Sequence, residues 1–123
     1  MVLETAARSA LADAFDDYVN TGAGTATLKL ETSGDVEVAT FDFQNPAFGA
    51  AASGVITLAG VPIEDASATG GTVAQGSIYN RNGTKVCESI AATSGQEITV
   101  SSTTIGAAES VSLTALTVTV PAS

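Results

Sequence analysis

Hydrophobic residues in the first twenty positions recur at steps of three and four residues. The stripe that they form consists of Leu3, Ala7, Leu11, Ala14, Phe15, Tyr18 and Val19. This spacing places the side chains on one side of an α-helix, so it predicts an amphipathic helix over residues 1–21 that covers one sheet or an open end of the fold. The helix is predicted to end at Asn20, Thr21 and Gly22, because Gly22 suits the left-handed backbone of a helix C-terminus.

After Gly24 the hydrophobic period changes to two, which is typical of strands. The predicted strands cover residues 25–31, 36–43, 54–59, 72–80, 84–90, 97–101 and 110–120. Asn82 and Gly83 stand between two of them and predict a hairpin turn. The pattern favours a mainly β fold, a β-sandwich or barrel-like sandwich of about six to eight strands with one N-terminal α-helix. The 123 residues are expected to form a single domain, with the β-sandwich over residues 24–121.

Two of the predicted strands change the face that carries their hydrophobic residues. In residues 36–43 the change falls after Val38, and in residues 110–120 it falls after Ala115. A slip of one residue in the alternation is what a β-bulge produces, so we expect a bulge in residues 36–43. The strand at residues 110–120 is long and changes its buried face partway, which suits a strand that crosses from one sheet to another.

A break in the pattern at residues 45–49 falls between Phe43 and Phe48, in a chain with four Phe, two Tyr and no Trp. Pro46 has no backbone N–H and favours an extended Asn45, so we expect the hydrogen-bonded ladder to stop there. Phe43 and Phe48 are then expected to plug one end of a core built mainly from small residues. The alternative interpretation is that Phe48 is exposed and anchors a partner protein.

The formal net charge is −9, from 4 basic and 13 acidic residues. Because phosphate backbones and anionic lipid surfaces attract basic proteins, this charge argues against binding to nucleic acid or to a membrane. No segment approaches the ~20 apolar residues of a membrane span. The first residues carry charges too early for a secretory signal, so a cytoplasmic product is expected.

Histidine is absent, and the chain has one cysteine, Cys87. The absence of His removes the commonest general base and the commonest metal ligand, and no Ser or Thr has a base placed beside it by a motif. We therefore expect neither an enzyme nor a cofactor. Cys87 lies in an alternating segment and is expected to be a buried thiol. Residues 76–85 do not match a phosphate-binding loop, since Thr84 separates Gly83 from Lys85.

Three acidic residues, Asp13, Asp16 and Asp17, lie in the C-terminal half of the predicted helix. The helix dipole favours cations there by ~0.3–1 kcal/mol each, so their position is unfavourable. One interpretation is a solvated face that tolerates this cost, and the other is a docking face for a basic partner surface. Adjacent carboxylates point in different directions, so no metal site is expected at Asp16 and Asp17 or at Glu64 and Asp65.

Three segments of the chain together form a pattern that resembles one in other proteins. They are ETAARSALADAFDDYV at the start, NPAFGAAASGV at residues 45–55, and the end from NGTKVCESIAATSGQEITVSSTTI through SVSLTALTVTVP. In this order and spacing, and covering most of the chain, they resemble a family of small bacteriophage virion proteins. This sequence departs from the family in a short connection between the first two predicted strands. It also has Ala, Gln and Gly at residues 74–76, where the family has an aromatic-rich strand.

The resemblance implies a non-catalytic structural protein of the phage head, a capsid decoration (cement) protein that binds the major capsid protein on the outside of the expanded shell. It implies synthesis in the host cytoplasm, localisation in the virion and, by analogy with decoration proteins at three-fold positions, a homo-oligomer that is a trimer. The candidate partner contacts are Asp13, Asp16, Asp17 and Phe48. The alternative is a tail or fibre component that binds another virion protein or a host-surface glycan.

Overall fold

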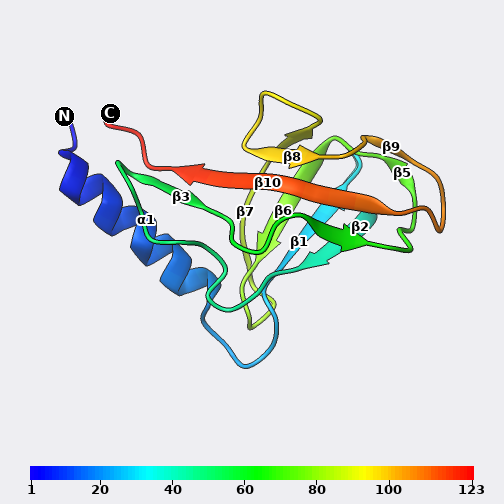
Figure 1. Ribbon diagram of the computed structural model, residues 1–123, viewed down its shortest axis with the longest axis horizontal. Helices are drawn as coiled ribbons and strands as arrows, with labels where there is room; N and C mark the ends of the chain where they lie inside the picture. The colour runs from blue at the N-terminus through cyan, green and yellow to red at the C-terminus, as the bar shows by residue number, and fades with distance from the viewer.

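The computed structural model describes residues 1–123, which form one helix and ten strands (Figure 1). Helix α1 (Thr5–Val19) begins after the extended residue Glu4 and ends at Asn20, which confirms the predicted helix. Gly22 has φ 126° and packs so closely on the hairpin turn that a Cβ there would lie 2.5 Å from the backbone nitrogen of Asn82. The lack of a side chain at Gly22 therefore allows the chain to pack closely on the hairpin turn, and Gly22 does not form the left-handed helix end that was predicted.

The strands form one large curled sheet and one small sheet. Their bounds are β1 (Thr27–Glu31), β2 (Glu37–Asp42), β3 (Val55–Thr57), β4 (Ile63–Asp65), β5 (Gly71–Thr72), β6 (Gln75–Tyr79), β7 (Lys85–Ala92), β8 (Ile98–Val100), β9 (Thr104–Ile105) and β10 (Val111–Thr119). The large sheet has the order β2-β1-β6-β7-β8-β10-β3, β4 also pairs with β10, and β5 pairs with β9 in the small sheet. Only the β7–β8 pairing is parallel. The large sheet curls into a half-barrel (Figure 1), so the predicted mainly β, barrel-like fold is confirmed.

Each predicted strand segment contains an observed strand, whereas the short strands β4, β5 and β9 were not predicted as separate strands. The bulge expected in residues 36–43 is present, whereas β10, which was expected to cross between sheets, stays in the large sheet and contains a bulge instead. The register of β1 against β2 leaves Val38 as an extra residue, and the register of β10 against β8 leaves Thr114 as an extra residue. The predicted turn at Asn82 and Gly83 joins β6 to β7, with Gly83 at φ 81°. The phase of the hydrophobic pattern therefore predicted local irregularities as well as strands.

The hydrophobic core comprises 23 buried residues on the inner side of the half-barrel and under α1. Its largest fully buried side chains include Phe41, Leu28, Leu30, Ile56, Ile78, Ile98, Leu113 and Leu116. Burying a side chain of this size contributes ~1.5–3 kcal/mol. Strand residues thus supply most of the large side chains, and α1 adds buried Ala12 and Val19 with Phe15 packed partly buried beside them.

The helix does not pack through most of its apolar stripe. Leu11 and Tyr18 are 51% and 49% exposed, and Ala7 and Ala14 are also exposed. We call these four residues the apolar flank of α1. The prediction that the stripe covers the sheet is therefore wrong for these residues, although Phe15 and Val19 do turn inward.

The physical reason is that polar side chains on the inward side of α1 bond to the backbone of distant segments. The Arg8 Nε donates to the carbonyl oxygen of Val120 at 2.8 Å, and the Ser9 hydroxyl accepts from the Gly54 N–H at 3.1 Å. These bonds orient α1 alongside β3 and the end of β10 (Figure 1). The two chain termini lie side by side, where the Leu3 N–H donates to the Ala122 carbonyl.

Candidate functional site

Two of the three candidate aspartates hold the loop at residues 45–54. An Asp13 carboxylate oxygen accepts from the Ala51 N–H at 2.9 Å, and an Asp16 oxygen accepts from the Phe48 N–H at 3.1 Å. Asp17 is exposed, and its carboxylate has no hydrogen-bond partner within the chain. Asp13 and Asp16 therefore have an intramolecular role that the sequence did not predict, and Asp17 presents its charge to solvent.

Phe48 lies in the core, with 2% of its surface exposed. Its ring meets the rings of Phe15 and Phe43 edge to face, each with a centroid separation of 6.2 Å. The expected plug of Phe43 and Phe48 is thus confirmed, with Phe15 of the helix as a third member. Since the side chain is buried, the interpretation of Phe48 as an exposed partner anchor does not fit this fold.

The pKa of the Asp16 carboxyl is raised above its ordinary value, chiefly because burial disfavours the charged form. Hydrogen bonds from the Phe48 N–H and from the Asn20 amide, the latter at 3.0 Å, act in the opposite direction. The nearby charges of Asp17 and Asp13 raise the pKa further. The bond between helix and loop therefore forms against a desolvation cost at neutral pH.

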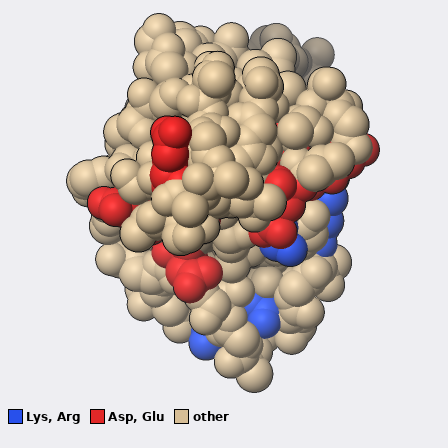
Figure 2. All heavy atoms as spheres, turned by 90° about the vertical axis from the view of Figure 1, so that its right-hand side faces the viewer, with Lys and Arg blue, Asp and Glu red and all other residues tan.

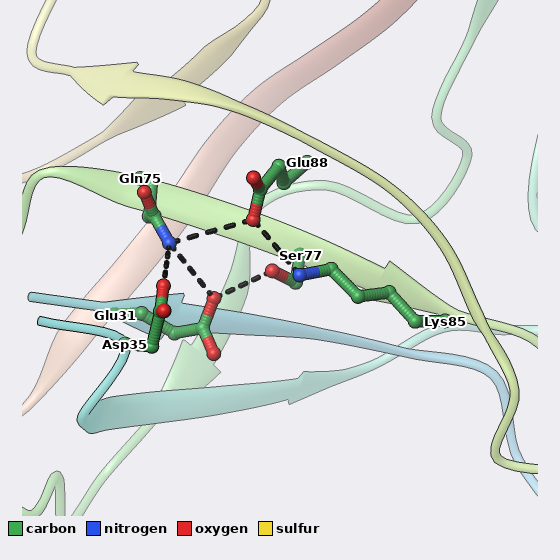
Figure 3. Close-up of polar contacts among 6 residues, drawn as sticks. All are labelled: Glu31, Asp35, Gln75, Ser77, Lys85 and Glu88. Atoms are coloured by element: carbon green, nitrogen blue, oxygen red, sulfur yellow. Dashed lines mark hydrogen bonds and ion pairs between the residues drawn. The ribbon is translucent and has the colours of Figure 1, made fainter. Parts of the chain in front are cut away.

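A cluster of three carboxylates comes from β1, from the turn between β1 and β2, and from β7, and it surrounds the side chain of Gln75 on β6 (Figure 3). Oxygen atoms of Glu31, Asp35 and Glu88 all lie within 4.8 Å of one another. The Gln75 amide nitrogen lies among them, 2.6 Å from the Asp35 oxygen and 3.5 Å from the other two carboxylates. The Ser77 hydroxyl, which is fully buried, donates to Glu31 at 2.5 Å. Only 7% of the surface of Glu31 is exposed.

The hydrogen bonds of the carboxylate cluster join β1, β6, β7 and the turn after β1, which gives the cluster a structural role. The Lys85 ammonium group lies 2.8 Å from Glu88 and partly offsets the repulsion among the three charges. Hard cations such as Ca²⁺ take carboxylate oxygens, and Glu31, Asp35 and Glu88 are the residues that would hold one. Because the amide nitrogen of Gln75 already fills the space between them, its side chain would have to turn before a cation entered.

A groove opens in the sheet between β7 and β10. Strand β8 pairs with β7 only at Ala91 and Ala92, so the earlier part of β7 has β6 on one side and no strand on the other. The opening leads into a pocket of about 220 Å³. We call this pocket and its opening the β7 groove, which is lined by Phe15, Cys87, Ser89, Ile98, Leu116 and Val118.

Cys87 is half-buried in the wall of the β7 groove. The pKa of its thiol is raised, first because burial disfavours the thiolate and then because Glu97 and Glu88 are near. A thiol whose pKa is raised is a poor nucleophile at neutral pH. Cys87 therefore acts as part of an apolar wall, in agreement with the expected packing role, although its side chain is less buried than predicted.

Neither the carboxylate cluster nor the β7 groove was predicted from the sequence. The cluster depends on the strand register, which places Gln75 opposite Glu31. The groove depends on the short β8, and the signal available was the short predicted strand at residues 97–101 between two longer ones.

The acidic residues do not gather into one large patch on the face shown in Figure 2. There they are scattered among uncharged side chains, and basic side chains lie at the right and in the lower part of this face, some of them next to acidic ones. None of the helical structure in this chain has the length and apolar character needed to cross a bilayer. Comparison of the chain with protein families, with curated proteins and with solved structures gives no match.

Proposed function

We propose that the protein is a non-catalytic structural component of a bacteriophage virion, a decoration protein that binds the major capsid protein on the outside of the expanded head shell. The observation that carries this proposal is the exposed apolar flank of α1. Leu11 and Tyr18 lie on it, and Met1 and Val2 add further exposed apolar surface in the N-terminal segment. Contiguous exposed apolar side chains rimmed by polar residues are typical of protein-binding surfaces.

The net charge of −9 supports a position outside the shell, because it repels packaged DNA. Asp17 lies next to Tyr18 and is free to meet a basic patch on the partner, which would accelerate association at low salt. By analogy with decoration proteins at three-fold positions, the bound form is a trimer.

The protein would act through linkage rather than chemistry. A ligand that binds only the expanded shell stabilises that state by RT ln(1 + [L]/Kd) at each site. Because a shell offers many equivalent sites, a modest gain at each is multiplied over the particle. Reaction of a bound substrate is not required at any step.

The proposal is tested by mixing purified protein with expanded empty shells and with compact precursor shells of the parent phage, followed by sedimentation. We expect binding to the expanded shells only, together with a higher shell melting temperature. Leu11→Asp should abolish binding because it places a charge in the apolar flank, whereas Ala6→Asp adds the same charge on another exposed side of α1 and should bind normally. Equal binding by both variants, or no binding by the unmodified protein, would overturn the proposal.

A further inference from the structure

Strand β7 has backbone groups without a partner at the β7 groove. The Ala91 N–H donates to the Ala74 carbonyl on the β6 side. Because backbone groups alternate in direction along a strand, the N–H and C=O of Glu88 point away from β6. Strand β8 begins only beside Ala91, so no strand receives them. An open strand edge of this kind is a template for pairing with another chain.

An apolar pocket lies directly beside this open edge. Its volume of about 220 Å³ is below the roughly 300–1,000 Å³ of sites for small molecules, and it suits a single large side chain. Phe15 forms the helix side of the pocket. Leu11 and Tyr18 lie one turn of α1 before and after Phe15, so the apolar flank continues the pocket along the helix.

The charge at the groove indicates the chemistry of its occupant. Glu88 is already paired with Lys85, but Glu97, which also lines the groove, is exposed and has no basic partner. The charges of both carboxylates reach the groove wall, since both raise the pKa of Cys87. A basic side chain next to an apolar one would match this arrangement, whereas a second acidic segment would be repelled.

We propose that the β7 groove binds an extended, basic and apolar segment of another protein, which pairs with the free edge of β7, places one large aliphatic side chain in the pocket and sets a Lys or Arg near Glu97. Main-chain pairing supplies affinity in this mode of recognition, and the pocket supplies specificity. The inference rests on the proposed role as a protein-binding component, but it does not require that the partner be a shell protein.

The first test uses the synthetic peptide Lys-Val-Lys-Leu-Lys-Val-Lys and the unmodified protein. At saturating peptide we expect alkylation of Cys87 by iodoacetamide to slow about tenfold, because the groove wall is covered, and hydrogen exchange of the Glu88 amide to slow by a similar factor. A peptide with Glu in place of Lys should protect neither group. Unchanged exchange at Glu88 and unchanged alkylation at Cys87 would overturn the inference without the use of any variant.

A pair of substitutions separates main-chain pairing from charge. Glu88→Pro removes the unpaired N–H without breaking a bond to β6, and Glu88→Gln removes the same charge while keeping the N–H. We expect the proline variant to bind the peptide about tenfold more weakly than the glutamine variant, since a hydrogen bond is lost and a strand edge is blocked. Equal affinities in two folded variants would contradict strand addition.

The same variants distinguish this inference from the proposed function. If Glu88→Pro weakens binding to shells and Glu88→Gln does not, the result would support both the groove inference and the proposed function. Shell binding unaffected by either variant, with Cys87 still reactive in the complex, would overturn the groove inference and leave the proposed function standing. Failure of the unmodified protein to bind shells would overturn the proposed function, and the peptide result would then decide the inference alone. Protection of Cys87 that grows with protein concentration in the absence of peptide would instead assign the groove to a second copy of this chain.

Discussion

Replacement of Phe48 by Ala tests how the loop at residues 45–54 and the helix are joined. The side chain is 2% exposed and contacts the rings of Phe15 and Phe43 edge to face. Replacement of a buried Phe by Ala lowers the free energy of unfolding by about 3–5 kcal/mol. Because two aromatic contacts are also lost here, we expect a decrease of about 4 kcal/mol for Phe48→Ala. That is a large share of the roughly 5–15 kcal/mol that holds a domain folded.

The assay is equilibrium unfolding in urea together with thermal melting. A loss of this size should lower the urea midpoint by about 2–3 M and the melting temperature by about 15 °C for a chain of this length. Phe48→Leu keeps much of the volume and should lose only about 1.5 kcal/mol. Tyr18→Ala, at a half-exposed position, should leave stability within about 0.5 kcal/mol while weakening shell binding. A Phe48→Ala protein with unchanged stability and lost binding would refute the core role.

Three further outcomes follow from the polar contacts. Asp16→Ala leaves the Phe48 N–H without its acceptor and should destabilise the fold by about 1–3 kcal/mol in urea unfolding, whereas Asp16→Asn keeps an acceptor oxygen and should be close to neutral at pH 7. The folded-state pKa of Asp16 is raised, so protonation of this carboxyl stabilises the folded protein; the contribution is complete below the unfolded pKa of about 3.9 and is lost as pH rises. The melting temperature of the unmodified protein should therefore rise relative to that of Asp16→Asn as the pH is lowered. The opposite trend would contradict the assignment. Gln75→Ala leaves three carboxylates facing one another and should lower the free energy of unfolding by about 1–3 kcal/mol. Added Ca²⁺ should not change the melting temperature of the unmodified protein. A saturable rise would instead indicate a cation site.

Local patterns in the sequence predicted the features that depend on neighbouring residues. The phase slip at Val38 predicted a bulge because alternation is a property of one strand and its pleat. Asn82 and Gly83 predicted their turn for the same reason. Pro46 predicted the end of a ladder. Phe43 and Phe48 were expected to fill one end of a core of small residues, with an exposed Phe48 as the alternative, and both are buried.

The orientation of α1 could not be predicted in this way. Its apolar flank has helical spacing, but the orientation of the helix is decided by hydrogen bonds between residues far apart in the sequence. Arg8 donates to the Val120 carbonyl, and the Ala51 N–H donates to Asp13. Strands as short as β4 carry too few residues to show a period. The carboxylate cluster and the β7 groove depend on which strands are neighbours and how long each pairing is, and periodicity carries neither kind of information.

We propose above that this protein binds the outside of an expanded phage head through the apolar flank of α1. Electron cryomicroscopy of the parent particle tests it most directly. We expect density for one helix on a half-barrel at the outer surface of the head, with Leu11 and Tyr18 facing the shell. Density for the fold in the tail alone, or on the head with α1 facing solvent, would contradict it.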